Sequence, residues 1–582
     1  MPQANCTRTG LSPRLLLLAS CLVLAGSASL VVGSARLQAG PRPESVANRP
    51  KLAVLVVFDQ LRGDYPARWR SLFGEGGFER LLTEGAWFAE CHYPYASTVT
   101  GAGHASMGTG VTPRVHGVIG NDWFDRAQGS KVYCATLGDR YQRVPSRAAG
   151  SGGRGGSPER LLVPALGDGI KQRDPPGKVV AMSLKDRGGV LIAGHRADAV
   201  YWFDDADGQF VTSTFYRAAP HDWAKAFNDR RVPDRWFGTQ WERLRPDVDY
   251  TAHAGPDVGP GEGSGVEQGV AFPHSMSGGM TEPGPRSYQA LYNSPFGNDL
   301  LWEFAKAAIE GERLGQGAAS DLLSISFSSN DAVGHTWGPD SHEVLDITLR
   351  SDRLMRDMLD YLDGRLGRGQ YVLVVCSDHG VVPLPERSAA QGIETGRVSA
   401  SRTMAALERH LQEKLGRGEN QGRWILTGGD MDVYLNERTL TAHGVPRATV
   451  EAEAKTFLES QTGILRVFTR TEMVGPMPAN DELAQRVWRG FHPDRSGDLY
   501  VVIKPYFYPS SRLTGTGHGT PHPYDTHVPL LVYGAGVRTG VRADAVTPLA
   551  AASILAEVLG VKLAPEAEAV PPDLLTLPAV PR

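Results

Sequence analysis

The chain has 582 residues, of which 41% are hydrophobic, and 60 Lys and Arg stand against 64 Asp and Glu. This length and apolar content allow one large domain with insertions and exclude a small module. The net charge of −4 excludes a global basic field that would recruit nucleic acid or an anionic membrane. We expect no nucleic-acid partner, and any attraction for an anionic ligand must be local.

The first 35 residues have the pattern of an export signal. Arg8 and Arg14 precede an apolar run from Leu15 to about Val32, and small residues follow. This order predicts a cleaved signal and a periplasmic or secreted protein without stable membrane association. A run of about eighteen residues is also long enough to remain as a membrane anchor. Cys21, at the end of a LASC string, offers a weaker lipoprotein alternative.

Three cysteines lie beyond this segment, namely Cys91, Cys134 and Cys376. They are too few for a disulfide scaffold, and no CxxC pair indicates structural zinc. A disulfide between Cys91 and Cys134 stays open for an oxidising compartment. Cys376 ends an apolar run, so we expect it to be a buried small residue.

Apolar runs of strand length alternate with amphipathic helical patterns along the chain. After a Pro-containing linker over 36–50, the first strand starts near Leu52, and the alternation recurs at 321–327, 343–363 and 371–376. Such alternation predicts an α/β fold with a mostly parallel central sheet and helices on both faces.

The composition also predicts how the chain is divided. We expect one domain over 51–565, followed by a tail over 566–582. Segments 145–157 and 251–285 are rich in Gly, Ser and Pro and are expected to be surface insertions. The stretch 386–500 has helical and strand patterns of its own, which predict a cap or subdomain.

Acidic and histidine side chains stand at the ends of the predicted strands. They are Asp59 after LAVLVVF, Asp331 and His335 after LLSISFS, Asp378 and His379 after YVLVVC, and His527 before VPLLVYG. In open α/β sheets, residues beyond the carboxyl ends of parallel strands converge on one site. The pattern therefore predicts a metallohydrolase.

A cluster of hydroxyls and glycines lies at 94–110, PYASTVTGAGHASMGTG, and leads into a predicted helix. A helix amino terminus offers free amide donors, and glycines let a phosphoryl oxygen approach the backbone. A hydroxyl bound to a divalent metal becomes a competent nucleophile. On this chemistry alone, Ser97, Thr98 and Thr100 are all candidates.

The ordered motifs FDQLRGDY, TVTGAGH, HGVIGNDWFD, LKDR, NDAVGH, SDHG and YDTHVPL resemble the alkaline phosphatase superfamily. Within it, the chain is most similar to the phosphate-irrepressible, threonine-nucleophile alkaline phosphatases, which are neighbours of the nucleotide pyrophosphatase/phosphodiesterases. The motifs span residues 52 to about 558. The resemblance implies that Thr100, four residues before His104 in T-x-x-x-H, is the nucleophile.

The resemblance also implies two zinc ions, which histidine and carboxylate ligands suit. One ion would be held by Asp331, His335 and His527, and the other by Asp59, Asp378, His379 and the oxygen of Thr100. His518 and His522 are the rivals for the place of His527. Other divalent metals remain open, because their affinities for such ligands overlap.

Asn121 in GND and Lys185 and Arg187 in MSLKDR match the residues that the family places at the phosphoryl oxygens. Two cations suit a monoester dianion, whereas a diester has an esterified group there. We expect a monomeric enzyme that hydrolyses small phosphate monoesters through a phosphothreonine. The alternatives are a phosphodiesterase or nucleotide pyrophosphatase with the same site, and a noncatalytic binder of metal or phosphate.

Overall fold

The computed structural model describes residues 49–145, 154–417, 422–429 and 431–576. The predicted export signal over 1–35 lies outside these residues, as do parts of the predicted segments 36–50, 145–157, 386–500 and 566–582. In the described part of the chain, no helix combines the length and apolar character needed to cross a bilayer.

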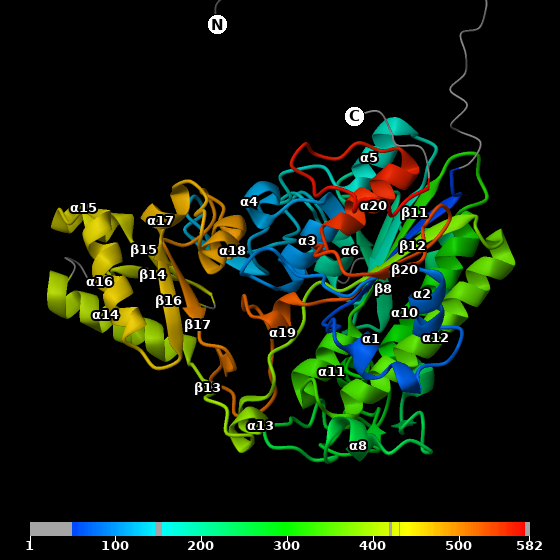
Figure 1. Cartoon of the computed structure of the whole chain (residues 1–582), viewed down its shortest axis with the longest axis horizontal. Helices are drawn as coiled ribbons and strands as arrows, with labels where there is room; N and C mark the ends of the chain where they lie inside the picture. Colours follow the sequence, from blue (N-terminus) through cyan, green and yellow to red (C-terminus); the bar gives the residue numbers. More distant parts are fainter. Residues whose placement is uncertain (1–48, 146–153, 418–421, 430, 577–582) are drawn as a thin grey trace, which may run out of the picture. The chain divides into compact units, whose positions relative to one another are not determined.

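A ten-stranded sheet organises the fold (Figure 1), in the order β20-β2-β19-β12-β1-β11-β6-β7-β8-β5. The five strands from β12 to β7 are parallel to one another. Antiparallel pairings attach β19 and β2 on one side and β8 and β5 on the other, and β20 is parallel to β2. The predicted α/β fold is confirmed, with antiparallel strands added at both flanks of the parallel centre. The strands are β20 (Gly540–Arg542), β2 (Ala86–Phe88), β19 (Leu530–Gly534), β12 (Tyr371–Cys376), β1 (Leu52–Phe58), β11 (Asp321–Phe327), β6 (Val179–Ser183), β7 (Ala199–Asp204), β8 (Gln209–Ser213) and β5 (Arg143–Val144).

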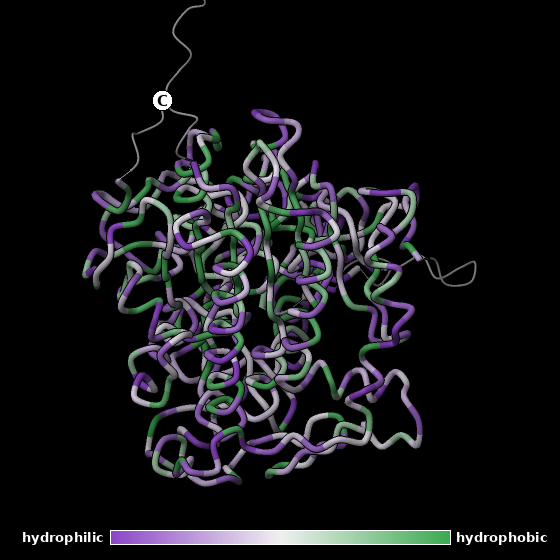
Figure 2. The backbone as a smooth tube through the Cα atoms, turned by 90° about the vertical axis from the view of Figure 1, so that its right-hand side faces the viewer, coloured by the Kyte–Doolittle hydropathy of each residue, from purple (hydrophilic) through white to green (hydrophobic). Residues whose placement is uncertain are grey.

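Helices cover both faces of the sheet, which explains why strands such as β1 (LAVLVVF) and β12 (YVLVVC) are apolar and buried throughout. In β1, Val54 and Val56 pack into one core with α2 (Phe78–Glu84), α10 (Pro295–Glu312) and α12 (His342–Leu366). The alternate residues Leu55 and Val57 pack into a second core on the opposite face. That core contains residues of α3 (Thr100–Thr109), α5 (Leu166–Arg173), α6 (Asp186–Ala193) and α20 (Ala550–Leu559). Along the helices the tube in Figure 2 alternates between purple and green, as amphipathic helices require.

A second, antiparallel sheet, called the small sheet below, has the order β14-β15-β17-β16. Val501 and Ile503 share a core with Leu407 and Leu458, while the alternate residue Val502 belongs to another cluster on the opposite face. The elements of this region are α14 (Ala400–Leu415), β14 (Ile425–Gly429), β15 (Asp432–Leu435), α15 (Glu437–His443), α16 (Arg447–Glu459), β16 (Ile464–Thr469), α17 (Arg470–Val474), α18 (Glu482–Gly490) and β17 (Leu499–Ile503).

Shorter elements connect these layers, and within the predicted insertion 251–285 the strand β10 pairs with β9. They are α1 (Tyr65–Arg68), η2 (Arg70–Leu72), α4 (Pro113–His116), β3 (Asp122–Asp125), β4 (Ser130–Tyr133), α7 (Asp222–Asp229), η3 (Val232–Trp236), β9 (Gln240–Trp241), α8 (Tyr250–Ala254), β10 (His274–Ser275), α9 (Pro285–Tyr292), α11 (Ser329–Trp337), α13 (Pro385–Ala390), β13 (Gly396–Arg397), β18 (Phe507–Tyr508) and α19 (Pro523–Thr526). Cys91, Cys134 and Cys376 are buried free thiols, so the structure shows no bond between Cys91 and Cys134.

Candidate active site

The carboxyl ends of neighbouring parallel strands bring the predicted ligands together. β1 ends level with β11 and beside the end of β12, with Phe58 opposite Phe327 and Val57 opposite Cys376. Asp59 follows β1 directly, and α11, which carries Asp331 and His335, begins just beyond β11. Asp378 and His379 follow β12 after one residue. The three loops therefore leave the sheet at one edge, where ligands bind in such folds.

Thr100 is the first residue of α3 and is fully buried. Its hydroxyl oxygen lies 3.4 Å from Nε2 of His379 and 3.4 Å from a terminal nitrogen of Arg187. The glycines of the TGAGH motif explain how α3 comes this close. A Cβ at Gly103 would lie 2.3 Å from the carbonyl oxygen of Asp378, and one at Gly101 would lie 2.9 Å from the Gly120 carbonyl.

Three histidines at this edge share one arrangement, in which Nδ1 faces a backbone carbonyl. The partners are the carbonyls of Thr516 for His335 at 2.6 Å, Gly380 for His379 at 2.9 Å and Thr98 for His518 at 2.9 Å. Because a carbonyl only accepts, Nδ1 must carry the proton, and Nε2 of each neutral ring is left as a lone-pair donor. Metal-binding histidines are commonly oriented in this way.

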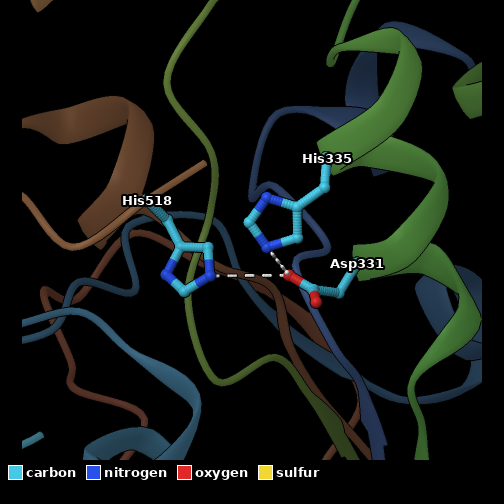
Figure 3. A group of neighbouring side chains, drawn as sticks. All are labelled: Asp331, His335 and His518. Atoms are coloured by element: carbon cyan, nitrogen blue, oxygen red, sulfur yellow. Dashed lines mark ion pairs between the residues drawn. The ribbon is translucent and has the colours of Figure 1, made fainter. Parts of the chain in front are cut away.

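The ring nitrogens face carboxylates. Nε2 of His335 lies 3.1 Å and Nε2 of His518 lies 3.5 Å from the same oxygen of Asp331 (Figure 3). Nε2 of His379 lies 3.4 Å from an oxygen of Asp59 and 3.4 Å from one of Asp378. Ligand atoms lie within 4.8 Å of one another in two groups, Asp331/His335/His518 and Asp59/Asp331/His379.

These donors fit divalent cations. Oδ1 of Asp59 and Oδ2 of Asp378 are buried and have no hydrogen-bond partner among the described residues, an arrangement that is unfavourable unless a cation completes it. Burial lowers the pKa of His379 to about 3 and also lowers that of His518. Both rings are therefore neutral near pH 7, as ligation requires.

Lys185 lies within this cluster, and its ammonium group is 2.5 Å from Oδ2 of Asp59 and 2.6 Å from Oδ2 of Asp331. Burial alone would lower its pKa, but the charges of Asp331 and Asp59 outweigh burial and raise the pKa above its usual value. Lys185 therefore stays charged and joins a carboxylate of each predicted metal set. It directly precedes α6, and Arg187 lies in the first turn of that helix.

The structure places His527 apart from Asp331 and His335, the residues with which it was predicted to bind a metal. Its Nε2 lies 2.8 Å from the carbonyl oxygen of Ala89, and its ring stacks on His92 with centroids 4.6 Å apart. His527 precedes β19 at the expected edge, but an isolated bridge to His92 turns it toward β2. His518 stands beside Asp331 and His335 instead.

Sequence periodicity carries no signal for His518, because residues 515–522, all of them described, are neither helix nor strand. The GHG sequence around it indicates only a loop. The other rival, His522, is also elsewhere, with Nε2 at 2.9 Å from the carbonyl of Ile503. The feature of the sequence that could have indicated His518 is the occurrence of three histidines within the ten residues 518–527.

Three further polar residues, Thr98, His104 and Asn121, make hydrogen bonds near the start of α3. The hydroxyl of the fully buried Thr98 donates to the carbonyl of Thr520 at 2.8 Å. His104 joins the carbonyl of Thr100 at 2.9 Å to the hydroxyl of Ser326 at 2.7 Å, and thus anchors the start of α3. Asn121 accepts the backbone N–H of Gly101 at 2.8 Å.

A cavity of about 290 Å³ opens over this site. Asn121, Arg187, His335 and His518 line it. The small sheet and the segment after it also contribute lining residues, namely Met431, Asp432, Tyr500 and Tyr508. The cavity is therefore lined by segment 94–110, by predicted metal ligands and by the small sheet.

The chain is similar to known proteins over most of its length. The family model of type I phosphodiesterase / nucleotide pyrophosphatase matches residues 53–527. The chain is 34% identical over 532 residues to alkaline phosphatase PhoV of Synechococcus elongatus, covering 90% of this chain and 93% of PhoV. It is 32% identical over 506 residues to alkaline phosphatase PafA of Elizabethkingia meningoseptica, covering 86% of this chain and 90% of PafA.

The crystal structure of wild-type PafA superposes with a TM-score of 0.83 at 31% identity and covers 90% of this chain and 99% of the PafA chain. The resemblance inferred from the ordered motifs is thus confirmed. The chain belongs to the type I phosphodiesterase / nucleotide pyrophosphatase family, within the alkaline phosphatase superfamily.

Proposed function

We propose that the protein is a metal-dependent alkaline phosphatase that hydrolyses phosphate monoesters through a covalent phosphothreonine at Thr100. The observation that carries the proposal is the position of the Thr100 hydroxyl at the start of α3. Its oxygen lies 3.4 Å from Nε2 of His379 and 3.4 Å from a terminal nitrogen of Arg187. A nucleophile, a metal-ligand nitrogen and a phosphate-binding cation thus meet at one point. The relatives named alkaline phosphatases support the same reaction.

Two divalent ions, zinc by ligand type, complete the proposed site. Asp59, Asp378 and His379 would hold one beside the oxygen of Thr100, and Asp331, His335 and His518 would hold the other. When bound, such ions supply the positive charge that favours the ionised Thr100 hydroxyl and the departing oxygen.

In the proposed reaction, Thr100 Oγ1 forms a bond to phosphorus as the bond from phosphorus to the ester oxygen breaks. Arg187 and the amide nitrogen of Asn121 stabilise the phosphoryl oxygens, because the carbonyl oxygen of Asn121 already accepts from Gly101. The ammonium group of Lys185, which lies between Asp59 and Asp331, adds a further positive charge to the site. Water then hydrolyses the phosphothreonine, and two inversions leave the configuration at phosphorus unchanged.

The cations favour a monoester over a diester. Arg187 lines the cavity, and with Lys185 it provides two positive charges for the dianionic phosphoryl group of a monoester. In a diester one of these oxygens is esterified and uncharged, so the same cations contribute less. Phosphodiester or nucleotide pyrophosphate hydrolysis at this site is the second candidate, which the matching family model supports.

Hydrolysis of p-nitrophenyl phosphate compared with bis-p-nitrophenyl phosphate tests the proposal. We expect a higher kcat/KM for the monoester and a dependence on added divalent metal. A diester preference would replace the proposal by the second candidate, and no turnover of either substrate would favour a binding protein. We further propose that the chain is exported to the periplasm or beyond and acts as a monomer, with residues 386–500 as a cap or subdomain.

A further inference from the structure

Thr98 is a buried residue of segment 94–110 that the proposed reaction does not use. It lies two residues before Thr100 and is fully buried, while its neighbours Ser97 and Val99 line the cavity. Its hydroxyl donates to the carbonyl of Thr520 at 2.8 Å, and its own carbonyl accepts from Nδ1 of His518 at 2.9 Å. Both bonds hold the loop that carries His518.

The same loop is fixed from its other side by Asp525, which is also fully buried. One carboxylate oxygen of Asp525 accepts the backbone N–H of Thr520 at 2.8 Å and its hydroxyl at 2.7 Å. Thr520 is thus held at its carbonyl by Thr98 and at its amide and hydroxyl by Asp525. The main chain of Asp525 also accepts from the N–H of Gly380, which follows His379.

Side-chain bonds of this kind matter here because the loop has little structure of its own. Residues 515–522, which the structure describes throughout, form neither helix nor strand. Gly519 has a φ of +113°, a conformation open to glycine and rarely to other residues. The position of the loop therefore depends on contacts with other segments, among them the bonds of Thr98 to Thr520 and His518 and the bonds of Asp525 to Thr520.

We propose that Thr98 is a positioning residue, which clamps the loop through Thr520 and directs Nε2 of His518 toward Asp331. The inference rests on the proposed function in so far as His518 is a ligand of the Asp331/His335 metal set. Its role differs from that of Thr100, because its hydroxyl and carbonyl are both engaged with the loop. Partners that orient a ligand typically change metal affinity by about 10- to 100-fold when they are removed.

Zinc affinity of the metal-free full chain tests the proposal, measured by competition with a chromophoric chelator. Thr98→Val removes the hydroxyl and keeps the volume and the carbonyl. We expect it to weaken zinc binding about tenfold or more at the site that contains His518 and to weaken the other site less. Thr98→Ser, which keeps the hydroxyl, should restore most of the affinity. Thr98→Ala serves if the valine variant does not fold.

Thr109→Val is the matched control. Thr109 is equally buried, lies in α3, and its hydroxyl donates to the carbonyl of Ala105 at 2.7 Å, so the same kind of bond is lost. This variant should bind zinc as the parental protein does. A double-mutant cycle adds the decisive readout, because Thr98→Val should have no further effect on zinc affinity in a His518→Ala background.

Equal zinc affinity of Thr98→Val and Thr109→Val would overturn the positioning role, and so would a serine variant that behaves like the valine variant. These outcomes leave the proposed function intact if the parental protein binds two zinc ions and hydrolyses p-nitrophenyl phosphate. A parental protein that binds zinc without turnover would overturn the proposed function alone. A parental protein that binds no zinc would overturn both.

Discussion

The imidazole of His518 stacks on that of His379, with ring centroids 3.4 Å apart and planes 15° apart. One ring belongs to each proposed metal set, and Asp331 contributes ligand atoms to both groups of neighbouring donors. The two sets are therefore packed against each other. A change at either ring is expected to disturb the neighbouring set as well as its own.

The first prediction separates His518 from His527. His518→Ala should reduce zinc affinity by about 10-fold or more, because it removes a ligand whose ring is oriented by Thr98. His527→Ala removes a ring that contacts Ala89 and stacks on His92, so zinc affinity should change less than twofold. Both are measured by chelator competition. Loss of zinc binding in the His527 variant alone would restore the assignment made from the YDTHVPL motif.

The second prediction concerns the nucleophile. Thr100→Ala should lower kcat for p-nitrophenyl phosphate on the order of 10³-fold or more, because the attacking oxygen is removed. Thr100→Ser keeps a hydroxyl and should retain a measurable part of the activity. Thr109→Val, a buried change in the same helix, controls for damage to α3. Near-parental turnover by the alanine variant would move the nucleophile to Ser97, which lines the cavity.

The third prediction concerns substrate charge. Replacing Lys185 and Arg187 together by Ala should reduce kcat/KM for p-nitrophenyl phosphate by about 10²-fold or more, since each donor to a developing charge contributes about that much. Hydrolysis of bis-p-nitrophenyl phosphate should fall less than tenfold. Zinc is kept saturating, because Lys185 also pairs with Asp59 and Asp331. Lys171→Ala, at a pair with Asp198, is the control, and equal losses for both esters would contradict the assignment.

Much of the site could be predicted from the sequence because apolar runs mark the parallel strands. A strand that is buried on both faces reads as a continuous run such as LAVLVVF, and its end locates Asp59. The same reasoning locates Asp331 and Asp378, and the structure brings all three together. Thr100 could not be separated from Thr98 by such reasoning, since both precede the same helix, and the family motif made that choice.

The rest could not be predicted because it depends on contacts between segments far apart in the chain. His518 is directed by the carbonyl of Thr98, 420 residues away in sequence, and no local pattern encodes that bond. His527 stands before a strand at the expected edge, yet its bridge to His92 turns it away. The flanking strands β2 and β20 have three residues each, too few for a periodic signal.

The last prediction concerns acid stability and rests on His116, a fully buried residue of α4. Nδ1 accepts the N–H of Val118 at 3.1 Å, so a neutral ring carries its proton on Nε2, which donates to the hydroxyl of Ser106 at 3.0 Å. Burial, reinforced by the charge of Arg495, lowers the pKa of His116 to about 3. The folded protein therefore keeps this ring neutral at pH values where the unfolded chain protonates it.

The sign of the pH effect follows from this difference. Below about pH 6.5 the unfolded chain binds a proton that the folded protein does not, so the free energy of unfolding falls as pH falls, by about 1.4 kcal/mol per pH unit down to about pH 3. His116→Asn cannot be protonated and should lack this contribution. Between pH 7 and pH 5, measured by urea unfolding of the metal-free proteins, the parental chain should lose about 2 kcal/mol more than the variant. Equal losses in the two proteins would show that His116 is protonated in the folded state.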